Sequence, residues 1–222
     1  MKTTAIIPVK SLDAALRRLE GTLGPAERER LAEALFLDLI AKLPRSSFID
    51  DTLVVTADPS VSRQARWLGN EVLEQSGDNG HPEAAIAGAR AATEAGADRV
   101  AMLAADCPLL DVEELDRHLG RTPQAALIVP DRHGTGTNAL VLSPPDAIEP
   151  AFGLESCSRH ISRARAAGIG FTLERIESLA MDLDTPEDMR DLRDRLLLDP
   201  DPAPRTAKVL WELGAQPEPA VA

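Results

Sequence analysis

Residues 100–110 read VAMLAADCPLL, an apolar run that leads into a carboxylate, a thiol and a proline. Residues 100–104 are apolar enough to form a buried strand. Asp106 follows at the point where that strand should give way to a turn. Ligands of open α/β sheets bind outside the carboxyl ends of the strands. The stretch therefore predicts a strand of such a sheet and a candidate binding residue beside it.

Apolar or β-rich runs of the same kind recur along the chain. They predict further strands at residues 4–9, 52–56, 125–129, 139–142, 169–176 and 179–183. Helices should fill the intervening segments, with starts at Pro25, Pro59 and Pro186 and with bodies over residues 83–95, 112–119 and 157–167. Strands that alternate with helices predict an α/β fold, with a mostly parallel sheet and helices on both of its faces.

The chain has 222 residues, and a typical domain has roughly 150. We therefore expect one domain with elaborations, spanning residues 1–198. Residues 199–222 begin DPDPAP and are expected to form a Pro-rich linker, a short helix around residues 209–213 and a C-terminal tail. The apolar stretch at the amino terminus is too short for a signal peptide, and no later one could span a bilayer. A cytoplasmic protein without a membrane partner is expected.

Acidic residues outnumber basic residues 36 to 24, which gives a formal net charge of −12. This charge argues against a nucleic-acid partner, because phosphate backbones are bound by basic surfaces. Aromatic residues make up 3% of the chain and tyrosine is absent, so a platform that stacks single-stranded bases is not expected either. An anionic substrate would have to be held by local features or by a metal, because the overall field repels it.

Three aspartates follow predicted strands. Asp106 follows residues 100–104, whereas Asp182 and Asp184 close the strand predicted at residues 179–183. Their i, i+2 spacing would place both side chains on one face of that strand. Carboxylate oxygens at strand ends suit Mg²⁺, which binds one or two carboxylates together with substrate phosphates. The structural alternative is that Asp106 caps the helix expected from about residue 110, and that Asp184 or Thr185 caps the helix that Pro186 starts.

Residues 134–138 read GTGTN and are expected to form a hairpin. The successive backbone N–H groups of such a hairpin could bind a phosphate without any net positive charge. The glycines could equally serve only the geometry of the turn. Ser156 has a similar pair of interpretations, because it stands either at a helix N-terminus that binds an anion or at a plain N-cap.

Five segments occur in the order found in a known family. They are residues 7–10 (IPVK), 103–109 (LAADCPL), 130–138 (PDRHGTGTN), 152–153 (FG) with Ser156 and His160, and 182–186 (DLDTP). Together they resemble the guanylyltransferases that act on small phosphorylated acids in the biosynthesis of the deazaflavin coenzyme F-420. The resemblance covers residues 3–198. It implies a single-domain, Rossmann-like nucleotidyltransferase fold, with a mostly parallel mixed sheet flanked by helices.

The resemblance also implies roles for particular residues. The catalytic and metal-binding residues would be Asp106, Asp182 and Asp184, with Mg²⁺ as the cofactor. The phosphorylated acid would be bound by Thr137, Gly153 and Ser156. The phosphates of GTP would face Lys10 and Arg18.

Two segments on the nucleotide side differ from the usual pattern of the family. Leu16 stands where relatives commonly have a lysine, and residues 80–83 read GHPE where they commonly have Gly-Leu-Asn. Glu83 could read guanine, because its carboxylate can accept from the N1–H and the 2-amino group, or it could simply favour the first turn of a helix. In the second case, backbone groups of residues 76–80, including Gly80, would recognise the base.

The reaction implied is the transfer of GMP from GTP to the phosphate of the acid, with release of pyrophosphate. A phosphate with a second pKa of about 6 is already an anionic nucleophile at pH 7, so no general base is required. The acid could be 2-phospho-L-lactate, phosphoenolpyruvate or 3-phosphoglycerate. Two alternatives remain: a related nucleotidyltransferase with another nucleotide or acceptor, and a catalytically silent nucleotide-binding subunit. A homodimer is compatible with the sequence, and the resemblance implies that a downstream deazaflavin transferase takes up the product.

Overall fold

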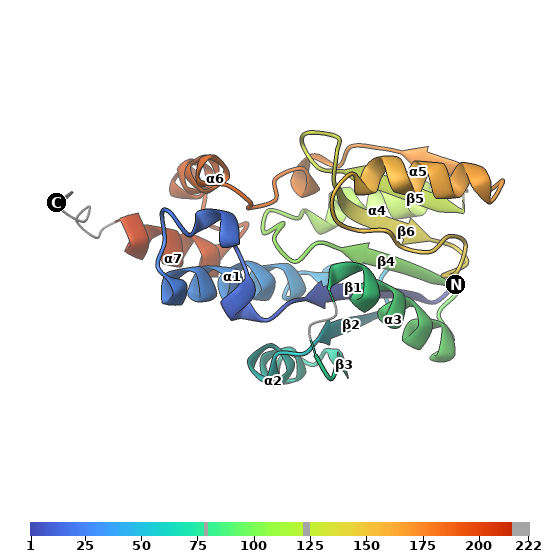
Figure 1. The fold of residues 1–222 in the computed structure, drawn as a ribbon, viewed down its shortest axis with the longest axis horizontal. Coiled ribbons are helices and arrows are strands. Elements are labelled where there is room, and N and C mark those ends of the chain that lie inside the picture. The colour runs from blue at the N-terminus through green and yellow to red at the C-terminus, as the bar shows by residue number, and fades with distance from the viewer. Residues whose placement is uncertain (78–79, 122–124, 215–222) are drawn as a thin grey trace.

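The computed structural model describes residues 1–77, 80–121 and 125–214. Its strands form one seven-stranded sheet in the order β3-β2-β1-β4-β6-β5-β7 (Figure 1). They are β1 Thr3–Val9, β2 Asp51–Thr56, β3 Glu71–Glu74, β4 Arg99–Leu103, β5 Ala126–Pro130, β6 Thr137–Leu142 and β7 Phe171–Leu173. The pairs β1–β2, β1–β4, β2–β3 and β5–β7 are parallel, and β6 runs antiparallel to both β4 and β5. The mostly parallel mixed sheet predicted from the sequence is therefore confirmed.

Helices and short 3-10 turns connect these strands. The α-helices are α1 Pro25–Ile40, α2 Pro59–Trp67, α3 His81–Glu94, α4 Val112–Arg121, α5 Ser156–Ala166, α6 Pro186–Leu198 and α7 Pro204–Gly214. The 3-10 turns are η1 Leu12–Ala14, η2 Arg17–Leu19, η3 Leu43–Arg45 and η4 Glu177–Leu179. Local chemistry explains where α2 starts. Pro59 is its first residue, and the carboxylate of the preceding residue, Asp58, accepts from the N–H groups of Ser60 and Val61.

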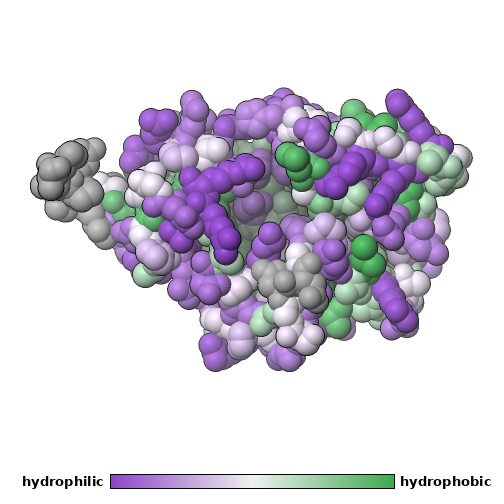
Figure 2. All heavy atoms as spheres, in the orientation of Figure 1, coloured by the Kyte–Doolittle hydropathy of each residue, from purple (hydrophilic) through white to green (hydrophobic). Residues whose placement is uncertain are grey.

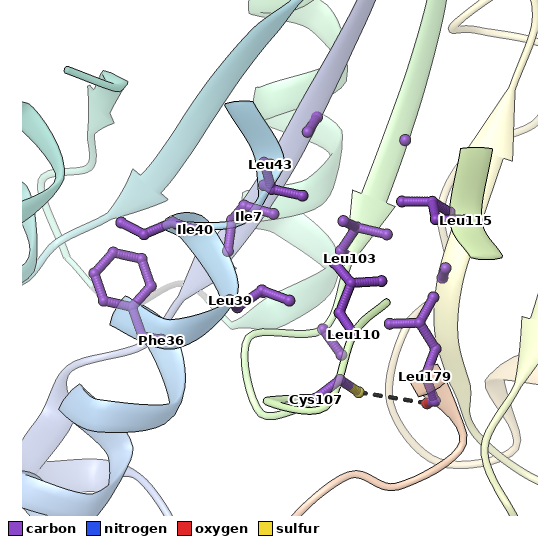
Figure 3. Close-up of a cluster of buried hydrophobic side chains, with 14 of the residues drawn as sticks. Ile7, Phe36, Leu39, Ile40, Leu43, Leu103, Cys107, Leu110, Leu115 and Leu179 are labelled. Carbon is purple, nitrogen blue, oxygen red and sulfur yellow. Dashed lines mark hydrogen bonds between the residues drawn. The ribbon is translucent and has the colours of Figure 1, made fainter. Parts of the chain in front are cut away.

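Side chains that alternate along the strands build a core on each face of the sheet. Ile7 of β1 packs in a cluster with residues of α1, α2 and α4, whereas its neighbour Ile6 packs with residues of α3 and α5. Figure 3 shows the first cluster, in which Phe36 and Leu39 of α1 lie on the same side of the sheet as Leu103 of β4. Burial on both faces explains why the central strands read as continuous apolar runs.

A third cluster lies at the end of the molecule opposite the amino terminus, where α1, α6 and α7 gather (Figure 1). It includes Leu31 and Leu35 of α1, Leu192 of α6 and Leu210 of α7. The buried carboxylate of Asp38 on α1 accepts from the N–H groups of residues 205 and 206, at 3.3 and 2.8 Å. Asp38 thereby caps α7 from a neighbouring helix and fixes α7 against α1.

The structure departs from the predicted elements in four places. Residues 179–183, expected to be a strand, form the end of η4 and an irregular segment. Their apolar character has another cause, since Leu179, Met181 and Leu183 are buried against the core clusters without joining the sheet. The short edge strand β3 was not predicted, β7 is shorter than the expected residues 169–176, and α7 is longer than the expected residues 209–213.

Candidate active site

A cleft of about 600 Å³ opens at the carboxyl ends of the central strands. This volume lies within the usual range for a small-molecule site. Figure 2 shows the hollow near the middle of that face of the molecule. Among the residues lining the cleft are eight that the sequence singled out, namely Lys10, Arg18, Asp106, Thr137, Gly153, Ser156, Asp182 and Asp184.

The two remaining predicted residues lie outside this cleft. Gly80 lines a smaller adjoining pocket, which shares Lys10 and His81 with the cleft. Glu83 lies in the first turn of α3 and is exposed, and it is not among the residues that line either pocket. The structure thus brings together in one cleft the residues predicted to bind the acid, the phosphates of GTP and the metal, and it places Gly80 in the adjoining pocket. The roles predicted for Gly80 and Glu83 in binding the nucleotide stay predictions.

Asp106 lies in the loop that follows β4 and is held there by two neighbouring segments. Its backbone carbonyl accepts from the N–H of Leu183 at 3.2 Å. Further along the loop, the ammonium group of Lys42 donates to the carbonyls of Pro108 and Leu110, at 2.5 and 3.1 Å. Burial raises the pKa of Asp106 to about 7, and the negative charges of Asp182 and Asp184 add to the increase. Asp106 is therefore a carboxylate whose charged form is poorly stabilised by this protein alone.

Asp182 is positioned by the side chain of Asn138, for which no role was predicted from the sequence. The side-chain amide of Asn138, buried at the start of β6, donates to Leu179 O at 2.7 Å and to Oδ1 of Asp182 at 3.2 Å. Burial raises the pKa of Asp182, and the hydrogen bond from Asn138 opposes that increase. A polar residue within an otherwise apolar strand was the available signal, because buried polar groups are nearly always paired.

Asp184 also lines the cleft, and its carboxylate accepts from Nη1 of Arg18 at 2.5 Å. Neither Asp184 nor Asp106 caps a helix: Asp111 accepts from the first turn of α4, and Thr185 is the N-cap of α6. The capping role is therefore excluded for the two aspartates and confirmed for Thr185. Neither carboxylate is used as a cap, and that of Asp184 pairs with Arg18 instead.

The donor set suits Mg²⁺ in its chemistry, because three carboxylates line one cleft and the charges of two of them raise the pKa of the third, Asp106. As arranged here, no group of three or more His, Cys, Asp or Glu residues within the described ranges stands close enough to hold a metal ion. Asp184 is directed toward Arg18 instead. Asp106 and Asp182 are the carboxylates that would hold the ion, and Asp184 would have to exchange Arg18 for it.

The glycine-rich hairpin does not offer the phosphate nest that its sequence suggests. The N–H groups of Thr135 and Gly136 donate to the carboxylate of Asp131, at 2.9 and 2.8 Å, and the N–H of His133 does so at 3.1 Å. A Cβ on Gly136 would lie 2.7 Å from Oδ2 of Asp131, so only glycine fits there. The interpretation of these N–H groups as phosphate ligands is wrong, because the chain's own carboxylate already binds them.

The turn before α5 is also largely satisfied from within. Gly153, with φ +104°, adopts a conformation that L side chains rarely take, and its carbonyl accepts from the N–H of Ser156 at 3.1 Å. The next N–H, that of Cys157, donates to Thr135 O at 3.1 Å and ties α5 to the hairpin. Glu155 is the N-cap, so Ser156 is the first residue of the helix. A ligand would therefore be bound by side chains such as those of Thr137 and Ser156, which line the cleft, rather than by these backbone groups.

The fold can now be compared with solved structures. A candidate nucleotide-diphospho-sugar transferase from Desulfovibrio desulfuricans superimposes with a TM-score of 0.77 at 19% identity, covering 97% of this chain and 96% of that chain. At this identity the likeness concerns the fold alone. The sheet order, the helices on both faces and the superposition define the class of fold: this is a Rossmann-like α/β protein with a mixed sheet.

Sequence comparison narrows the class. The family described as "Guanylyl transferase CofC like" matches residues 3–195. A phosphoenolpyruvate guanylyltransferase from Conexibacter woesei is 43% identical over 197 residues, covering 87% of this chain and 88% of that protein. A 2-phospho-L-lactate guanylyltransferase from Methanothermobacter thermautotrophicus is 35% identical over 195 residues, covering 86% and 84%. The chain belongs to the CofC-like guanylyl transferases, and the family predicted from the sequence is confirmed.

None of the helices in the described ranges combines the length and the apolar character that a membrane span requires.

Proposed function

We propose that the protein transfers GMP from GTP to the phosphate of a small phosphorylated acid and releases pyrophosphate. The observation that supports this proposal is a single cleft lined by the carboxylates Asp106 and Asp182 together with cationic and hydroxyl side chains. Lys10 and Arg18 are among its cations, and Thr137 and Ser156 are among its hydroxyl side chains.

In the proposed reaction, a phosphate oxygen of the acid attacks the α-phosphorus of GTP. A new P–O bond forms as the bond to the β,γ-pyrophosphate breaks, so the product carries a diphosphate bridge between guanosine and the acid. The nucleophile needs no base, because phosphate is already ionised at neutral pH with a second pKa of about 6. Catalysis then depends mainly on positioning two polyanions and on stabilising charge.

The residues of the chain divide this task between the two substrates. Lys10 and Arg18 would neutralise the triphosphate, which is otherwise repelled by a protein of formal net charge −12. Thr137 and Ser156 would hold the phosphate of the acid with neutral hydroxyl groups, and Gly153 shapes the turn that positions Ser156. Gly80 and Glu83 would lie on the base side of the nucleotide.

Asp106, Asp182 and Asp184 would hold Mg²⁺. The ion, when bound, neutralises phosphate charge and aligns the attacking and leaving oxygens. Binding of the ion would offset the repulsion between Asp106 and Asp182, and Arg18 would be available to the triphosphate if Asp184 bound the ion in its place.

The names of the relatives support phosphoenolpyruvate and 2-phospho-L-lactate as the acceptors to test first. We also propose that residues 1–198 carry the activity, that the reaction belongs to coenzyme F-420 biosynthesis in the cytoplasm, and that a downstream deazaflavin transferase takes up the product. A homodimer is part of the same proposal.

The test is mass spectrometry of the products formed from GTP, Mg²⁺ and a panel of acids: phosphoenolpyruvate, 2-phospho-L-lactate and 3-phosphoglycerate. A downstream deazaflavin acceptor enzyme traps an unstable product. One acid should give a guanosine diphosphate adduct, and Asp106→Asn should give none. Binding of GTP without any adduct would instead support a silent nucleotide-binding subunit, and an adduct formed from ATP would indicate another nucleotide specificity.

A further inference from the structure

His160 is fully buried in α5, and both of its ring nitrogens face a hydrogen-bonding group. Nε2 lies 2.8 Å from the backbone nitrogen of Ala151, which donates to it. Nδ1 lies 3.0 Å from Oγ1 of Thr137. The ring also packs edge-on against Phe152, with centroids 5.2 Å apart. The imidazole is therefore held in one orientation between a loop and the first residue of β6.

These contacts determine the tautomer of the ring. The backbone N–H of Ala151 can only donate, so Nε2 has to accept and carries no proton. A neutral imidazole then carries its proton on Nδ1, which donates to Oγ1 of Thr137. A doubly protonated ring would direct an N–H at the N–H of Ala151. Burial, followed by the charges of Arg163 and Arg159, lowers the pKa of His160 to about 4, consistent with the neutral form.

The tautomer has a consequence for Thr137. Because Oγ1 accepts from His160, the hydroxyl proton of Thr137 is not used in that contact. Thr137 lines the cleft beside Asn138 and Ser156. We propose that His160 is a positioning residue that holds Thr137 as a hydrogen-bond donor toward the phosphate of the acceptor acid. This inference rests on the proposed function. It adds that a buried, uncharged residue, His160, orients the hydroxyl group of Thr137 that would bind the acid.

Such an arrangement suits an acidic protein. It supplies a fixed donor for an anion without adding a charge that the nearby carboxylates would attract. It also explains why a histidine can be buried among apolar side chains such as those of Phe152 and Cys157, since both of its nitrogens are satisfied.

The first test needs no variant. Nitrogen-15 NMR of the wild-type protein at pH 7 distinguishes the two neutral tautomers of a histidine from each other and from the charged ring. The His160 ring is assigned by its through-space contacts with the methyl group of Thr137. We expect the neutral form with the proton on Nδ1. A proton on Nε2, or a charged ring, would overturn the proposal.

The second test separates positioning from general packing. His160→Gln keeps an acceptor for Ala151 and removes the donor to Thr137, and we expect it to raise KM for the acid by about tenfold, the usual scale for one hydrogen bond. KM for GTP should change by less than about twofold. His160→Asn retains an N–H near the position of Nδ1 and should restore most of the loss. His118→Gln, a change of the same type away from the cleft, is the matched control.

A double-mutant cycle completes the test. Thr137→Val removes the hydroxyl, so His160→Gln should add less than about twofold to KM for the acid in that background. Independent, multiplying effects would contradict the proposal, as would equal increases in KM for the acid and for GTP. If His160→Gln does not fold, His160→Asn and the wild-type NMR spectrum decide. If the wild type transfers no guanylyl group at all, the proposed function fails, and the tautomer is still judged by NMR.

Discussion

The side-chain amide of Asn138 donates to Oδ1 of Asp182 at 3.2 Å, which joins the start of β6 to a loop 44 positions further along the chain. The same amide donates to Leu179 O at 2.7 Å. One buried side chain therefore fixes both the path of the loop and the direction of a carboxylate in the cleft.

We expect Asn138→Ala to leave two acceptors without their donor and to let Asp182 move. The free energy of unfolding should fall by about 1–3 kcal/mol, the usual cost of leaving a buried polar group unsatisfied. The Mg²⁺ concentration that supports half-maximal turnover should rise by roughly 10- to 100-fold, as is typical when an outer-shell partner of a metal ligand is lost. Thermal unfolding and a Mg²⁺ titration of activity measure the two effects. An unchanged Mg²⁺ requirement would show that Asn138 serves the loop alone.

Asp106 should make the stability of the metal-free protein depend on pH. Burial, with the charges of Asp182 and Asp184, raises its pKa from 3.8 to about 7 in the folded state. Between these values the folded protein holds a proton that the unfolded chain has lost, so the free energy of unfolding should decrease as pH rises through this window. Asp106→Asn carries no such charge, and its Tm should exceed that of the wild type by more at pH 8 than at pH 5.

The same variant should have no measurable turnover, which would show that the carboxylate is kept for function at a cost in stability. Calorimetry of both proteins in the presence of a chelator measures the difference in Tm. A difference that is the same at pH 5 and pH 8 would contradict the raised pKa.

The ion pair of Arg18 and Asp184 should contribute little to stability. Their side chains are 67% and 47% exposed, and exposed pairs are usually worth less than about 1 kcal/mol. Asp184→Asn should therefore leave Tm nearly unchanged and lower kcat by roughly a hundredfold or more, the scale for losing one stabiliser of transition-state charge. Arg18→Met should mainly raise KM for GTP. Full Mg²⁺-dependent turnover by Asp184→Asn would exclude Asp184 from the metal site.

Asp38 should stabilise the packing of α7 on α1 without affecting catalysis. Its carboxylate is fully buried and accepts from the backbone of residues 205 and 206 and from the side chain of Arg205. Asp38→Ala should cost about 1–3 kcal/mol, which lowers Tm by roughly 2–10 °C in a protein of this size. Glu212→Gln, which breaks an exposed ion pair with Arg30 between the same two helices, is the control and should change Tm little.

For Asp38→Ala, kcat and KM measured well below Tm should match the wild type, because Asp38 is not among the residues that line the cleft. Equal Tm values for Asp38→Ala and Glu212→Gln would show that the buried cap contributes no more to stability than the exposed ion pair does.

Much of the fold follows from local sequence. The apolar runs of β1 and β4 predicted central strands because those strands are buried on both faces, and the residues ahead of Pro59 and Pro186 predicted helix starts because they supply N-caps. β3 escaped prediction because Glu71–Glu74 is a short, partly exposed strand that pairs, among the described strands, with β2 alone. Residues 179–183 read as a strand because burial, rather than sheet pairing, determines their hydropathy.

The sequence predicted which residues lie near one another in the site, but it did not predict the contacts that they make. Asp106 and Thr137 share a cleft because the chain returns each to the same edge of the sheet, and the strand pattern contains that information. Whether the N–H groups of Thr135 and Gly136 face a substrate or Asp131 depends on how one aspartate side chain turns, which the spacing of residues does not specify. The pairings of Asn138 and His160 likewise join segments far apart in the chain, so no local pattern contains them.

The most direct measurement is phosphorus-31 NMR of a reaction with GTP, Mg²⁺ and phosphoenolpyruvate, with 2-phospho-L-lactate in a parallel sample. The proposed function predicts pyrophosphate and a new diphosphate-bridged guanosine adduct in equal amounts, dependent on both substrates and absent with Asp106→Asn. Phosphate release from GTP without an adduct, or no reaction with any phosphorylated acid while GTP is bound, would contradict it.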